Sequence, residues 1–120
     1  MVRRYLSVFL SCLFLFSGIA SADFESEVID LVNVERAAEG LPPLAYDANL
    51  AAAARGHSED MGLNNYFNHT NLEGRSACGR MTDAGYNWNY CGENIAAGQS
   101  TPESVINTWM ASPGHRANIL

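Results

Sequence analysis

The chain has 120 residues, a length that accommodates one domain. Hydrophobic residues make up 48% of it and charged residues 17%, a balance that allows a core and excludes a disordered chain. Two of the seven basic residues and none of the thirteen acidic ones precede Asp23, so the chain from there on carries a formal charge of −8. This acidic balance argues against a nucleic-acid partner and against binding to an anionic membrane surface.

Residues 1–22, MVRRYLSVFLSCLFLFSGIASA, have the pattern of a signal peptide. Arg3 and Arg4 form a basic start, an apolar run follows, and the segment ends on Ala20-Ser21-Ala22, the small-x-small pattern that a signal peptidase accepts. The apolar run is short for a membrane span, and an uncleaved N-terminal anchor is the alternative. We therefore expect a secreted or periplasmic protein whose mature chain has no stable membrane span.

Two helices are predicted next. Apolar residues recur at helical spacing over 24–39, and Gly40 with the prolines after it ends that helix. Asp47 caps a second helix, ANLAAAARGHSEDMGL. His57 falls on the apolar face of this second helix, where a lone histidine is more often a hydrogen-bonded core residue than a ligand.

Residues 64–100 are rich in asparagine, glycine and aromatic side chains, a composition in which functional sites are common. One short helix is predicted there, with Ser76 as its cap and Gly85 as its stop. The segment YNWNYCGENIA alternates in part and predicts one strand near its end.

Two more helices are predicted from their start signals, Thr101-Pro102 and Ser112-Pro113. In the second of these, Ser112 is expected to be the cap. The inward-facing residues of the first are expected to be Val105, Ile106, Trp109 and Met110.

Removal of residues 1–22 leaves two cysteines, Cys78 and Cys91. An even pair in an exported chain predicts a disulfide, and two free buried thiols are the alternative. Neither cysteine belongs to a C-x-x-C motif, so they make a weak metal site.

Three side chains from separate segments are candidates for chemistry. His69 lies in a polar loop, His115 lies at a helix start, and Glu93, between Gly92 and Asn94, is the acid whose neighbours are least polar. Two imidazoles and one carboxylate match an open zinc site with a fourth position for water. No H-E-x-x-H spacing supports that interpretation.

Read together, LVNVERAAEGLPPLAYDANLAAAARGHSEDM, FNHTNLEGR, AGYNWNYCGENIAAG and VINTWMASPGHRANIL resemble the CAP superfamily (cysteine-rich secretory proteins, antigen 5 and pathogenesis-related proteins). They are most similar to its small secreted bacterial branch. The segments occur in the family's order and cover nearly all of residues 23–120. GENIAAG and WMASPGHRANIL are close to a family signature.

The resemblance implies an α+β fold, an α-β-α sandwich with a small antiparallel sheet. It also implies a central cavity in which His69, Glu93 and His115 are the metal ligands and Zn²⁺ is the cofactor. The family's second acid falls on Ser112, and His57 is a candidate substitute ligand. Because family members continue beyond HRANIL with further strands, residues 23–120 are expected to form a C-terminally truncated CAP (SCP-like) domain that lacks those strands.

Three functions follow as hypotheses. The favoured one is a secreted module that binds a metal ion or a lipid, sterol or other cell-envelope ligand. The alternative is a metal-dependent, peptidase-like hydrolase that uses His69, Glu93 and His115. In the third, the same trio only organises the core through mutual hydrogen bonds. A binding role is favoured over an enzyme because no serine or cysteine lies in an activating motif and Ser112 leaves one acid–base role unfilled.

Overall fold

The computed structural model describes residues 7–8 and 20–120. This part of the chain forms, in order, β1 (Ser7–Val8), α1 (Ala20–Ala38), α2 (Ala48–Asn64), α3 (Ala77–Asp83), β2 (Glu93–Asn94), α4 (Pro102–Met110) and α5 (Pro113–Ile119). The predicted signal peptide falls mostly on residues 1–6 and 9–19, outside the described residues, and stays a prediction. Among the helices that are described, none is long and apolar enough to cross a membrane.

Capping side chains start three of the helices where the sequence predicts. Asp47 accepts hydrogen bonds from the amides of Asn49 and Leu50, and Ser76 accepts one from Gly79. Thr101 and Ser104 form a reciprocal capping box at the start of α4. Ser112 is the N-cap residue of α5, as predicted, but its side chain makes no capping hydrogen bond. Pro113 follows at the first helical position, as predicted.

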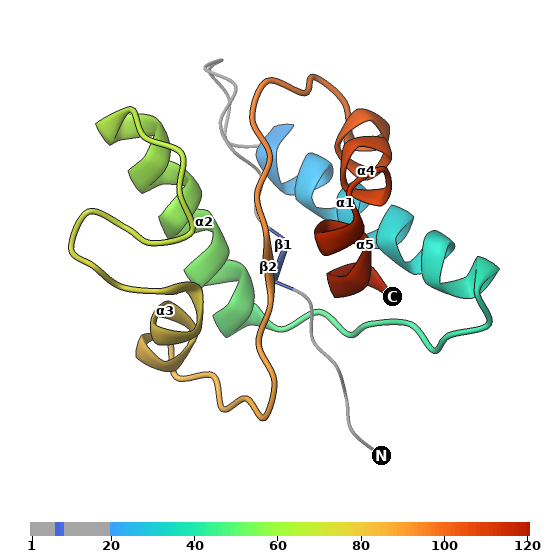
Figure 1. Cartoon of the computed structure of the whole chain (residues 1–120), viewed down its shortest axis with the longest axis horizontal. Coiled ribbons are helices and arrows are strands. Elements are labelled where there is room, and N and C mark those ends of the chain that lie inside the picture. The colour runs from blue at the N-terminus through green and yellow to red at the C-terminus, as the bar shows by residue number, and fades with distance from the viewer. Residues whose placement is uncertain (1–6, 9–19) are drawn as a thin grey trace.

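The helices form two layers around the strand pair. Figure 1 shows α2 and α3 on one side of β1 and β2, and α1, α4 and α5 on the other. This arrangement confirms the α+β class and the α-β-α order of layers, with a middle layer reduced to two short strands.

The strand pair differs from the expected sheet because β1 and β2 run parallel, with Ser7 opposite Glu93 and Val8 opposite Asn94. An antiparallel pairing is therefore wrong for the strands that the structure describes. Parallel strands need a long crossover connection, and the chain between β1 and β2 supplies one that contains α1, α2 and α3.

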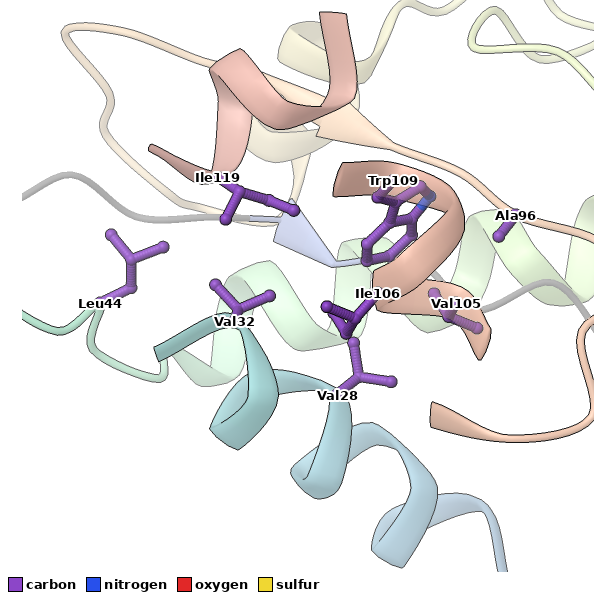
Figure 2. Close-up of a cluster of buried hydrophobic side chains, with 8 residues drawn as sticks. All are labelled: Val28, Val32, Leu44, Ala96, Val105, Ile106, Trp109 and Ile119. Atoms are coloured by element: carbon purple, nitrogen blue, oxygen red, sulfur yellow. The ribbon is translucent and has the colours of Figure 1, made fainter. Parts of the chain in front are cut away.

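The main core lies between α1 and the two C-terminal helices (Figure 2). Trp109 of α4 is fully buried at its centre, and its Nε1 donates to the carbonyl oxygen of Ile95, 3.1 Å away. This bond links the core to the residue that follows β2. The cluster comprises Val28, Val32, Leu44, Ala96, Val105, Ile106, Trp109 and Ile119.

Candidate functional site

Glu93 lies in β2 between the two helical layers, and only 2% of its side chain is exposed. It is the one acid among the buried residues that the structure describes, as its apolar and small neighbours in the sequence suggest. The strand approaches α5 closely here: a Cβ on Gly92 would stand 3.0 Å from Oδ1 of Asn118. Glycine at position 92 therefore permits the contact that holds Glu93 in the middle of the fold.

Both carboxylate oxygens of Glu93 have partners. Nδ1 of His69 donates to Oε1 at 2.7 Å, and Nη2 of Arg80 donates to Oε2 at 2.5 Å. The Arg80 side chain is 10% exposed, whereas the His69 side chain is 53% exposed. Glu93 is thus held from the interior by a guanidinium and from the solvent side by an imidazole.

Arg80 also orders the chain around it. Its Nη1 donates to the carbonyl oxygens of His69, at 2.8 Å, and Arg75, at 3.0 Å. One side chain therefore fixes the loop that carries His69 and the start of α3 relative to Glu93. Sequence reasoning did not single out Arg80, because an isolated arginine on a short helix is usually solvated.

The predicted disulfide between Cys78 and Cys91 is present, with the two Cα atoms 5.8 Å apart. Each cysteine stands two residues before a member of the buried ion pair, Cys78 before Arg80 and Cys91 before Glu93. The crosslink therefore brings the two charged residues together. This equal spacing is the signal from which the pairing of Arg80 and Glu93 could have been predicted.

His115 lies in the first turn of α5, next to the pair but not bonded to it. Burial lowers the pKa of His115, and electrostatic repulsion by the nearby His69 acts in the same direction. Its buried Nδ1 has no hydrogen-bond partner among the residues that the structure describes, and none of the hydrogen bonds there joins it to Glu93. The structure thus joins His69 to Glu93 and leaves His115 beside them.

Two asparagines, also missed in the sequence, hold His115 against β2. Asn94 is completely buried, and its Nδ2 donates to the carbonyl oxygen of His115 at 3.0 Å. Asn118 donates from Nδ2 to Oδ1 of Asn94 at 2.8 Å. These bonds tie the start and the middle of α5 to the strand that carries Glu93.

His57 is a core residue of α2, with 2% of its surface exposed. Its Nε2 lies 2.8 Å from the carbonyl oxygen of Asn68, which can only accept, so Nε2 carries a proton. Its ring also meets the edge of Tyr66, with ring centroids 6.0 Å apart. His57 thereby holds the loop that carries His69, which agrees with the structural interpretation of this residue.

Acidification is expected to destabilise the protein through His57. Burial lowers the pKa of His57, and the charge of Arg80 adds to this effect. In the unfolded chain His57 has its ordinary pKa of about 6.5, so as the pH falls below that value the unfolded chain takes up a proton before the folded protein does. The contribution of neutral His57 to the free energy of unfolding is therefore complete above that pH. It is lost as the pH falls toward the lower pKa of the folded protein. The urea midpoint should be lower at pH 5.5 than at pH 7.5, and His57→Gln, which keeps a donor for Asn68, should reduce the difference. An unchanged difference would contradict the role of His57.

The expected zinc site does not fit these contacts. Among the described residues there is no group of three or more histidine, cysteine or acidic side chains placed to hold a metal ion. Each oxygen of Glu93 already accepts a hydrogen bond, one from His69 and one from Arg80, and none of the described hydrogen bonds joins the imidazole of His115 to Glu93. His57 uses Nε2 for Asn68. A zinc ion on Glu93 would have to lie next to the guanidinium of Arg80, whose positive charge repels a second cation.

An open groove of about 660 Å³ lies between α2, the loop at 71–73 and α3. Small residues of α2, Ala52, Ala53 and Gly56, line it together with polar side chains. Arg80 and His57 line it too, so the groove adjoins the Glu93 cluster. Its other lining residues are Asp60, Asn64, Asn71, Leu72, Glu73, Asp83 and Ala84.

A solved structure with a similar fold is an extracellular protein containing an SCP domain, from Bacillus anthracis str. Ames. The two superpose with a TM-score of 0.80 at 32% sequence identity, over 90% of this chain and 38% of that one. Two proteins of Bacillus subtilis (strain 168) are also similar: YkwD, 45% identical over 97 residues, and the membrane protein YlbC, 38% identical over 96 residues.

These relatives are much longer than this chain. The aligned region covers 81% of this chain but 38% of YkwD, and 80% of this chain but 28% of YlbC. The family model of the cysteine-rich secretory proteins matches residues 29–120, which include both helical layers, the disulfide and the Glu93 cluster. The chain therefore belongs to the CAP family, the cysteine-rich secretory protein family.

Proposed function

We propose that this CAP domain is an extracytoplasmic binding module that takes a polar component of the cell envelope into the groove between α2 and α3. The proposal rests on this groove. Its volume, about 660 Å³, is in the range of small-molecule sites, and its lining combines a floor of small residues with amides, carboxylates and one guanidinium. The polar part of this lining offers hydrogen-bond partners to the hydroxyl and amide groups of a glycan or a short peptide.

An extracytoplasmic location is supported by three observations. Residues 1–22 have the pattern of a signal peptide. The chain forms a disulfide, which persists in oxidising compartments. A similar solved structure comes from a protein described as extracellular.

Filling the groove is expected to abolish binding without unfolding the protein. A Cβ added at Gly56 meets nothing within 4 Å, so Gly56→Leu projects a leucine into open space. The ligand should bind roughly tenfold more weakly or worse, because the leucine occupies part of the groove in which the ligand lies. Removing a glycine from a helix interior should at the same time add up to about 1 kcal/mol of stability.

The measurement is an NMR titration of the ¹⁵N-labelled protein with soluble peptidoglycan fragments released by a muramidase. Ala48→Leu is the matched control, since it adds a leucine to an exposed position of the same helix outside the groove. Shifts should concentrate at the groove in the wild type and in Ala48→Leu. Equal binding by Gly56→Leu, or a response to phosphatidylglycerol vesicles in place of the fragments, would contradict the proposal.

The alternative of a metal-dependent hydrolase finds no specific support in the contacts of the site. The positive charge of Arg80 lies against Glu93, which weakens this carboxylate both as a general base and as a ligand for a second cation. We therefore base no reaction on this cluster.

A further inference from the structure

The Glu93 carboxylate is neutralised from within the protein. A carboxylate with 2% exposure is stable only beside an opposite charge or several donors, and Arg80 supplies the opposite charge and one donor at 2.5 Å. His69 takes the second oxygen at 2.7 Å. The side chain of Arg80 thus already balances the negative charge of Glu93, which a bound cation would otherwise balance.

Arg80 is also held in place independently of Glu93. Nη1 donates to two backbone carbonyl oxygens, those of His69 and Arg75. The disulfide two residues before each partner restrains the pair further. A guanidinium keeps its proton over the whole physiological range, so no change of pH in that range removes this cation.

We propose that Arg80 is the specificity-determining residue of this site: it occupies the place of a metal ion beside Glu93 and excludes divalent metals from the His69–Glu93 cluster. The wild-type site is therefore independent of metal. Removing the guanidinium opens one oxygen of Glu93 next to the imidazole of His69, a combination of ligands that zinc accepts.

The test is a calorimetric titration of the protein with zinc chloride. The wild type should show no zinc binding that depends on His69, so His69→Ala should leave its isotherm unchanged. Arg80→Met should bind zinc at least roughly tenfold more tightly than the wild type, the size of effect typical of residues next to a metal site. Adding His69→Ala to Arg80→Met should abolish the gain.

Arg75→Met is the matched control. It removes another arginine–carboxylate pair from the same region, the one with Asp83, and leaves the partners of Glu93 intact. It should bind zinc as the wild type does. A second readout is thermal unfolding, in which zinc should raise the midpoint of Arg80→Met and leave that of the wild type in place.

Two results overturn the proposal. One is tight zinc binding by the wild type that is lost in His69→Ala, and this arm decides the matter even if Arg80→Met does not fold. The other is a folded Arg80→Met that binds zinc no better than the wild type. Neither of these two results depends on which ligand the groove binds. A zinc titration that contradicts the role of Arg80 therefore leaves the proposed binding function untouched, and the reverse also holds.

Discussion

Trp109→Ala should lower the free energy of unfolding by about 3–5 kcal/mol, the range for truncating a large aromatic in a core. Trp109 is fully buried at the centre of the main cluster, so its loss leaves a cavity among residues of three helices. It also leaves the carbonyl oxygen of Ile95 without its indole donor. Urea unfolding followed by far-UV circular dichroism measures the change.

Trp88→Ala is the control for this experiment. Trp88 is 42% exposed and donates to the hydroxyl of Thr82 on the surface. Its removal should cost much less stability, because surface substitutions that break no buried contact have small effects. Equal losses in the two variants would contradict the assignment of the core.

Arg80→Met should be the most destabilising substitution in the site, at roughly 3–5 kcal/mol, because it leaves a buried carboxylate without its cation. Arg80→Met combined with Glu93→Gln should be more stable than Arg80→Met alone, since glutamine removes the stranded charge and still accepts from His69. Urea unfolding at pH 7.5 compares the two variants. If the double variant were less stable than Arg80→Met, the guanidinium would stabilise the protein through its hydrogen bonds to the backbone and not through its charge.

The helices were predictable from the sequence because their start signals are local. Asp47, Ser76 and Thr101 each bond to an amide two or three residues later, so the pattern and the contact lie in the same short window. Ser112 shows the limit of that reasoning. It has the residue type and the proline of a helix start, but the hydroxyl makes no capping bond.

The strand pairing was not predictable in this way. β2 could be located from a short alternating segment, but its partner, Ser7–Val8, lies at the other end of the chain. Pairing between distant segments depends on how the helices between them pack, and no local pattern records that.

The candidate site was predictable in part. The motifs that carry the family resemblance identified His69 and Glu93, and the structure joins them. The same motifs suggested a metal, because they do not show that Arg80 donates a hydrogen bond to Glu93. Charged residues in or just before a short helix look alike in sequence whether they are solvated or buried, and only the spacing from the two cysteines distinguishes Arg80 from Arg75.

That spacing has a thermodynamic consequence. Because the crosslink and the ion pair both hold α3 against β2, each raises the effective concentration of the other's partners. Coupling between two equilibria is reciprocal, so the factor by which the crosslink favours the contact between guanidinium and carboxylate is also the factor by which that contact favours the crosslink. The disulfide is therefore expected to resist reduction better while the guanidinium of Arg80 and the carboxylate of Glu93 are joined.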